Sequence, residues 1–225
     1  MKIILTDKQY DRIVNEQILN KIKNFFTGDD KSSESDVFCS TDIIKPASWK
    51  DLYSKLVQKK MITQGEPLII VWGPNQTLYY TSDGKNLVTN LKISTGANGF
   101  GNTEDDKKTP TGLIKVTNKI QGKDYEVMVG KRGTGKILGP NTDSLRIDDK
   151  TGKPHNAEVL TGILELSGLE KCNANVFSRN IYFHGTNKEK SLGGAHSNGC
   201  IRVSNKGIKW LLNNIKVGTK VYIKP

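Results

Sequence analysis

The sequence contains few of the residues that usually hold metal ions. Its 225 residues include three cysteines and three histidines. Cys39, Cys172 and Cys200 are odd in number and irregularly spaced, so we expect neither a disulfide framework nor a CxxC metal site, and at least one thiol is free. No HExxH motif or cluster of ligands is present, which argues against a metal-dependent hydrolase. We expect no metal and no cofactor.

Long apolar runs and nucleic-acid-binding motifs are absent as well. No run approaches the ~18 apolar residues of a membrane span, so we expect none. Residues 1–16 turn polar after three apolar residues and do not resemble a secretory signal. The net charge of +11 indicates either a polyanionic partner (nucleic acid, a membrane surface or an anionic cell wall) or a solvated lysine-rich surface. Because the basic residues are spread along the chain, we expect no nucleic-acid partner.

Residues 1–62 are predicted to form a helical extension. Apolar residues recur at helical spacing over residues 6–26, which indicates an amphipathic helix. This helix serves either to dock or oligomerise the protein or to pack on the domain that follows. Residues 28–42 are polar, acidic and serine-rich, which is typical of a flexible linker in which Cys39 is incidental. A second helix is predicted over residues 48–61, with capping-box spacing at its start.

After the second helix, the apolar pattern changes to that of strands. Short β-branched and aromatic runs at residues 68–72, 77–81 and 87–94 are separated by turn residues and predict an antiparallel meander. Residues 96–108 form a glycine-rich segment that we expect to be a mobile loop beside the active site. We therefore predict that residues 63–225 form a mainly β domain, a sandwich or barrel of short antiparallel strands with a few helices.

The chemistry of the chain is concentrated in residues 181–204. Cys200 lies at a turn next to Gly199, where a cysteine can expose its sulfur and neighbouring backbone N–H groups, as an acyl-transfer nucleophile requires. His184 follows an apolar, strand-like run and is the candidate base. Because the pair is too far apart to be neighbours on a helix, the glycine-rich loop between them must fold back. Residues 206–214 are predicted to form a helix behind the nucleophile loop.

Three short motifs surround the candidate pair: HGT at 184–186, LG at 192–193 and S-x-GCIR at 197–202. Together they resemble the catalytic signature of YkuD-type L,D-transpeptidases, which remodel bacterial peptidoglycan. The match extends backwards to TPTG at 109–112 and forwards to the strand-like run at 217–223. The resemblance extends roughly from Pro67 to the C-terminus, and one departure is that the family usually has histidine where this chain has Asn198. His196 lies two residues earlier.

This resemblance implies a reaction. His184 takes the thiol proton or stabilises a thiolate, and Cys200 attacks the carbonyl after the L-centre of diaminopimelate in a tetrapeptide stem. D-Ala leaves, and an amine of a second peptidoglycan stem peptide takes the acyl group to give a 3→3 cross-link. The resemblance also implies acylation by β-lactams of the carbapenem class. Backbone N–H groups of residues 198–200 are the expected oxyanion donors, which includes Gly199 among the catalytic residues.

The remaining site residues are predicted to bind substrate or to support the catalytic pair. Asn198 is expected to position the substrate or the oxyanion without acid–base duty, because an amide cannot titrate. Arg202 is expected either to pair with a substrate carboxylate or to brace the loop, and the same two roles are open for Arg179. The other predicted contacts are Gly185, Thr186 and Ser197, with Thr186 orienting the imidazole.

Three functions remain open at this stage. The first is the transpeptidase. The second is a lytic L,D-endopeptidase or carboxypeptidase of a phage or effector type, in which water is the acceptor. The third is a non-catalytic wall-binding or virion module with an unreactive Cys200. In each case the protein is expected to act at the bacterial cell wall or periplasm, and without a signal it would be delivered by phage, by lysis or by a secretion system.

Overall fold

The computed structural model describes residues 39–124, 145–147, 154–156 and 159–225. The predicted helix at residues 6–26 and most of the predicted linker lie outside these described residues. Within them, no helix is both long enough and apolar enough to cross a lipid bilayer.

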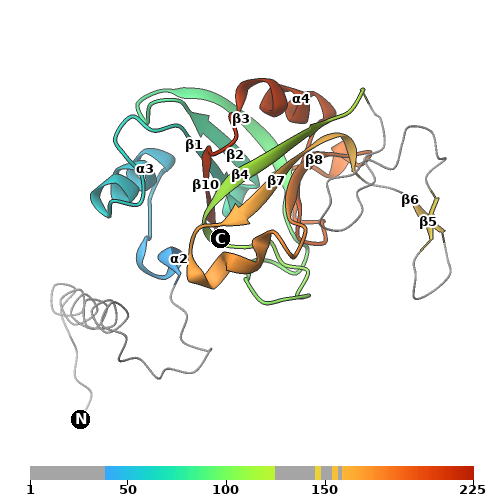
Figure 1. The fold of residues 1–225 in the computed structure, drawn as a ribbon, viewed down its shortest axis with the longest axis horizontal. Coiled ribbons are helices and arrows are strands. Elements are labelled where there is room, and N and C mark those ends of the chain that lie inside the picture. The colour runs from blue at the N-terminus through green and yellow to red at the C-terminus, as the bar shows by residue number, and fades with distance from the viewer. Residues whose placement is uncertain (1–38, 125–144, 148–153, 157–158) are drawn as a thin grey trace, which may run out of the picture. The chain divides into compact units, whose positions relative to one another are not determined.

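Eight strands of the described chain close into a barrel in the order β1-β10-β4-β7-β8-β9-β3-β2 (Figure 1). Most neighbours are antiparallel, which confirms the predicted mainly β architecture, but β1 pairs with β10 and β8 pairs with β9 in parallel. The parallel pairing of β8 and β9 arises because the loop between them is a crossover and not a hairpin. The strands are β1 (Leu68–Trp72), β2 (Thr77–Thr81), β3 (Leu87–Ser94), β4 (Gly112–Gln121), β7 (Leu160–Gly168), β8 (Tyr182–Gly185), β9 (Ile201–Val203) and β10 (Lys220–Lys224).

The predicted meander is present with the predicted limits. Strands β1, β2 and β3 are consecutive antiparallel neighbours, and the short helix η2 (Gly73–Asn75) forms the first turn. Two further short strands, β5 (Leu145–Ile147) and β6 (Pro154–Asn156), pair only with each other. The second of these carries His155, which the sequence suggested to be exposed and non-catalytic.

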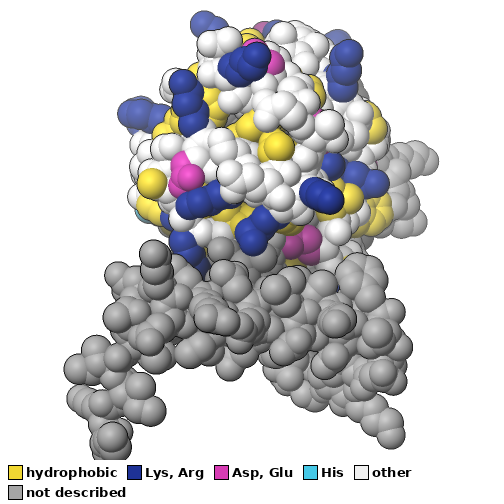
Figure 2. All heavy atoms as spheres, turned by 90° about the vertical axis from the view of Figure 1, so that its left-hand side faces the viewer, with side chains coloured by type: hydrophobic (Ala, Val, Ile, Leu, Met, Phe, Trp, Pro, Cys, Tyr) yellow, Lys and Arg dark blue, Asp and Glu magenta, His cyan; other side chains and the backbone are white. Residues whose placement is uncertain are grey.

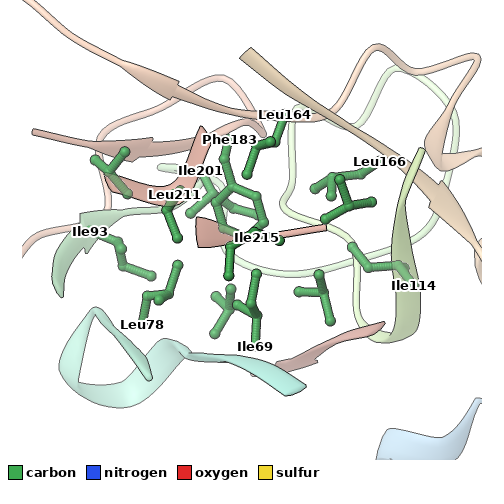
Figure 3. Packing of buried hydrophobic residues seen from close by; sticks show 14 of the residues in the cluster. Ile69, Leu78, Ile93, Ile114, Leu164, Leu166, Phe183, Ile201, Leu211 and Ile215 are labelled. Carbon is green, nitrogen blue, oxygen red and sulfur yellow. The ribbon is translucent and has the colours of Figure 1, made fainter. Parts of the chain in front are cut away.

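The barrel interior is filled by aliphatic side chains and Phe183 (Figure 3). Phe183 on β8 and Ile201 on β9 are register partners, and both are fully buried. Helix α4 (Asn205–Asn214) closes one side of this core, and Ser204 caps its start by accepting a hydrogen bond from the amide of Gly207 at 3.0 Å. Strand β8, which carries His184, and the segment that follows Cys200 are therefore anchored in the core.

Helix α3 (Trp49–Gln58) forms a second apolar cluster. Its start is capped by Ser48, as predicted, and its face of Leu52, Tyr53 and Leu56 is buried with side chains of β1 and β10. Residues 39–62 belong to the same compact unit as the barrel, so this unit begins earlier than the predicted boundary at residue 63.

A disulfide joins Cys39 and Cys172, whose Cα atoms lie 5.6 Å apart although 133 positions separate them in the sequence. It links α2 (Ser40–Ile43) to the short helix η3 (Lys171–Val176), and the two lie side by side in Figure 1. The Glu170 carboxylate supports the junction by accepting a hydrogen bond from the backbone N–H of Ser40 at 2.8 Å. The interpretation of Cys39 as incidental was therefore wrong.

Lysine and arginine side chains are distributed over the face shown in Figure 2 and do not gather in one block there. This agrees with their even spacing along the sequence. A dispersed positive charge acts as a diffuse field and not as a shaped binding site.

Candidate active site

The parallel pair of β8 and β9 brings the two predicted catalytic side chains to adjacent strands. His184 is the register partner of Arg202, and continuing this register by one residue beyond Phe183 and Ile201 places Cys200 beside Tyr182. Strand geometry then puts the Cα atoms of His184 and Cys200 roughly 8 Å apart, with both side chains on the face opposite the core. The loop therefore folds back as predicted.

Cys200 is the free thiol of the chain and is partly buried. Its Sγ donates a hydrogen bond to the backbone carbonyl of Asn180 at 3.3 Å. Burial raises the pKa of the thiol from 9.0 to about 11, and this effect outweighs the Tyr182 backbone hydrogen bond and the charges of Arg202 and Arg179, which lower it. At neutral pH the resting group is a thiol, so attack on a carbonyl requires a base.

His184 is suited to that task by its tautomer. The side chain is only 3% exposed, and Nδ1 lies 2.8 Å from the carbonyl oxygen of Gly185. Because a carbonyl can only accept a hydrogen bond, Nδ1 carries the proton, and Nε2 of the neutral ring holds the lone pair. Gly185 thus orients the imidazole through its own carbonyl, and its predicted role in substrate binding stays a prediction.

Ser197 organises the turn that carries the nucleophile. Its hydroxyl accepts a hydrogen bond from the amide of Gly199 at 3.1 Å and donates one to the carbonyl of Cys200 at 2.6 Å. Gly199 has a φ of +116°, a backbone conformation that favours glycine. Since the Gly199 amide is already engaged, its predicted use as an oxyanion donor would require the bond to Ser197 to break.

Thr109, which the sequence marks only as part of the TPTG motif, contacts the same turn. Its fully buried hydroxyl accepts a hydrogen bond from the amide of Gly96 and donates one to the carbonyl of Gly199, both at 2.8 Å. The TPTG motif was the available signal, but its spacing does not reveal a contact across 90 positions.

Both arginines brace loops in this structure. Arg202 is 4% exposed and donates to the carbonyl of His196 at 3.0 Å. Arg179 forms an ion pair with Asp106 at 2.7 Å and donates to the carbonyl of Lys108, also at 2.7 Å. The glycine-rich loop that we expected to be mobile does lie beside the nucleophile, and these contacts hold it in place.

Two other predicted residues lie at the edge of the site. The buried Thr186 hydroxyl accepts a hydrogen bond from the amide of Lys188 at 3.1 Å, whereas the bond from Nδ1 of His184 goes to a backbone carbonyl. Asn198 is exposed on the nucleophile loop, as is His196. The structure thus gives Asn198 access to a ligand from solvent.

The described residues contain one group of side chains with the spacing of metal ligands, and it is distant in sequence from the nucleophile. Cys39, Glu170 and Cys172 have donor atoms within 4.8 Å of one another. The two cysteines form the disulfide, so their sulfur atoms are not available as thiolate ligands.

Comparison with known proteins agrees with this geometry. A family model described as the L,D-transpeptidase catalytic domain, YkuD, matches residues 66–223. The "Probable L,D-transpeptidase ErfK/SrfK" of Salmonella typhimurium is 29% identical over 184 residues, which cover 81% of this chain and 52% of that protein. The "Probable L,D-transpeptidase YbiS" of Escherichia coli is 30% identical over 153 residues, which cover 68% and 43%.

This chain therefore spans about half the length, or less, of these two curated relatives. Among solved structures, an L,D-transpeptidase from Mycobacterium smegmatis aligns with a TM-score of 0.46 at 15% identity and covers 71% of this chain and 59% of that one. The family match covers well over half of the sequence and includes both His184 and Cys200. The chain therefore belongs to the YkuD family of L,D-transpeptidase catalytic domains.

Proposed function

We propose that this protein is a peptidoglycan L,D-transpeptidase that forms 3→3 cross-links between diaminopimelate-containing stem peptides through a thioester on Cys200. The observation that carries the proposal is a free thiol directly before β9, beside the strand β8 that carries a buried histidine whose Nδ1 is hydrogen-bonded to a backbone carbonyl. Family membership supplies the reaction class. The substrate, the thioester and the acceptor are our inference.

The first half of the reaction is acylation. Nε2 of His184 takes the thiol proton while Sγ of Cys200 leaves the Asn180 carbonyl and attacks the peptide carbonyl after the L-centre of diaminopimelate. The carbonyl electron pair moves to oxygen, and a backbone N–H of the nucleophile loop stabilises the charge. Collapse of this intermediate breaks the C–N bond, and D-Ala leaves with the proton held by the imidazolium.

The second half transfers the acyl group. An amine of another stem attacks the thioester, His184 accepts the amine proton, and the thiolate of Cys200 leaves and is reprotonated. A thiolate with a raised pKa is a poorer leaving group, so this step also benefits from an imidazolium beside the sulfur. Water in place of the amine would give hydrolysis, and the same residues would perform it.

The surrounding residues have supporting roles in this proposal. Ser197, Arg202 and Arg179 position the loops, since each donates to a backbone carbonyl within or beside the nucleophile turn. Exposed Asn198 is the residue that we assign to the substrate, as a neutral hydrogen-bonding partner. Thr186 supports the start of the crossover loop through its bond with Lys188.

We place the reaction at the bacterial cell wall. The disulfide between Cys39 and Cys172 supports this, because such bonds persist in oxidising compartments and are rare where thiols are kept reduced. The dispersed positive charge of the chain is compatible with an anionic wall matrix.

Intact-protein mass spectrometry after incubation with a disaccharide carrying a diaminopimelate tetrapeptide tests the proposal. We expect an adduct equal to the stem less D-Ala on the native chain and none on Cys200→Ala or Cys200→Ser, together with cross-linked dimers among the products. Shortened stems without dimers would show that water, and not a second stem, accepts the acyl group, so that the protein is a hydrolase. No adduct on the native chain would exclude acyl transfer to this substrate and favour a binding module.

A further inference from the structure

The Thr109 hydroxyl occupies a junction between two loops. It lies beneath the nucleophile turn with no exposed surface, accepts from the amide of Gly96 and donates to the carbonyl of Gly199, each at 2.8 Å. Both contacts have the length of good hydrogen bonds. The hydroxyl proton is thereby committed to one acceptor, which fixes the direction of the Gly199 carbonyl.

The direction of that carbonyl determines the direction of the next N–H group. The peptide bond between Gly199 and Cys200 is trans and planar, so its C=O and N–H groups point in opposite directions. Because Thr109 holds the oxygen, the amide proton of Cys200 is aimed away from the loop that carries Thr109.

The neighbouring amide is not equally available. The N–H of Gly199 donates to Ser197 at 3.1 Å, and the same serine hydroxyl holds the carbonyl of Cys200 at 2.6 Å. Among the oxyanion donors expected from the sequence, the backbone N–H of Cys200 is therefore the one whose direction is set by the hydrogen bond from Thr109 to the Gly199 carbonyl.

The peptide between Gly199 and Cys200 needs a hydrogen bond from another segment to fix its orientation, because glycine restricts the backbone little. Gly199 adopts a φ of +116°, and glycine can populate several other backbone conformations at little cost. Rotation of this peptide would turn an oxygen toward the position where negative charge develops, which would repel that charge. A buried hydroxyl on the carbonyl opposes the rotation.

We propose that Thr109 is a positioning residue that fixes the peptide between Gly199 and Cys200, so that the Cys200 N–H stabilises the oxyanion during acylation. The inference rests on the acyl-transfer function proposed above. In the step concerned, Sγ of Cys200 bonds to the carbonyl carbon, its proton passes to His184, and the carbonyl π electrons move to the oxygen that the Cys200 N–H faces. Thr109 does not touch the substrate.

The test compares two reactions of the same sulfur. Acylation by the disaccharide tetrapeptide or by a carbapenem passes through an oxyanion, whereas alkylation by iodoacetamide displaces iodide and forms none. Both rates are measured by mass spectrometry for the native chain, Thr109→Val, Thr109→Ser and a matched control, Thr111→Val. Thr111 lies in the same motif, and its hydroxyl contacts the side chains of Asn102 and Cys39 and not the nucleophile turn.

We expect Thr109→Val to slow acylation by at least about 10-fold, within the roughly 100-fold loss caused by removing an oxyanion donor outright. Alkylation should change less than about threefold, and Thr109→Ser, which keeps the hydroxyl, should retain most of the acylation rate. Thr111→Val should behave like the native chain in both reactions. The ratio of the two rates separates a lost oxyanion donor from general damage to the site.

Equal slowing of both reactions in Thr109→Val, or an unchanged acylation rate, would overturn the positioning role while the proposed function stands. If Thr109→Val does not fold, Thr109→Ala takes its place. A loss of acylation in Thr109→Ser as large as that in Thr109→Ala would then overturn the positioning role equally. Absence of acylation in the native chain would instead refute the proposed function, and this inference with it.

Discussion

The protonation state of Cys200 is the property of the site that is easiest to test. Burial raises the pKa of this thiol from 9.0 to about 11. Near pH 8 a shift of this size lowers the thiolate fraction about 100-fold. A more basic thiolate is also a better nucleophile, and a Brønsted slope of about 0.4–0.5 over this shift restores roughly 6- to 10-fold. The net expectation is alkylation about 10-fold slower than that of an ordinary thiol.

The assay measures iodoacetamide alkylation of Cys200 from about pH 6 to 11, in the native chain and in the urea-unfolded chain without reductant. The disulfide between Cys39 and Cys172 stays closed, so a single thiol reacts in both samples. The unfolded chain, whose thiol has a pKa of 9.0, should reach its plateau above about pH 10, whereas the native rate should continue to rise toward pH 11. The two curves therefore separate most clearly at alkaline pH.

The shift also predicts the sign of a stability change. The native state keeps the Cys200 proton to a higher pH than the unfolded chain, so this group contributes stability below pH 9.0, and that contribution is lost as pH rises toward about 11. A native alkylation plateau below about pH 8 would refute the reasoning. It would mean that His184 holds the sulfur as a preformed thiolate, the other activation mode that the sequence left open.

Three further predictions concern the support of the site. Gly199→Ala should abolish acylation and lower the melting temperature, because a Cβ there would lie 3.0 Å from a backbone oxygen at a φ of +116°; a native-like rate and melting temperature would contradict this. Replacing Cys39 and Cys172 together by alanine should lower the free energy of unfolding by up to about 5 kcal/mol, measured by urea titration, since the bond closes a loop across 133 positions. Arg179→Met should lower the free energy of unfolding by about 3–5 kcal/mol, because it removes the ion-pair partner of Asp106. Adding Asp106→Asn should restore part of this loss. If the effects of the two substitutions simply add in the double variant, the pair is not coupled.

The sequence predicted those parts of the fold that depend on local patterns. The three strands of the meander and helix α3 are specified by apolar spacing and by turn or capping residues within a few positions of each other. Helix α4 was found for the same reason, with Ser204 as its cap. The proximity of His184 and Cys200 could also be predicted, because both residues lie in short motifs with recognisable chemistry, and their catalytic roles stay a prediction.

Contacts between distant segments could not be predicted in this way. Nothing within ten residues of Cys39 indicates that it pairs with Cys172, and an odd number of cysteines leaves the pairing open. Likewise, the spacing of Arg179 does not show whether it meets a substrate or a backbone carbonyl. The parallel pairing of β8 and β9 is also non-local, since a crossover loop leaves no hairpin signature between the two strands.

The exposed Asn198 and the buried hydroxyls of Ser197 and Thr109 explain how a signature can change at one position and keep its geometry. These two hydroxyls hold the nucleophile turn through three hydrogen bonds, and none of the three involves the Asn198 side chain. Replacing the usual histidine there by asparagine therefore removes a titratable group from the surface of the site without loosening the turn. The acid–base work of the proposed reaction then rests on His184, whose ring is oriented by a backbone carbonyl that no substitution can delete.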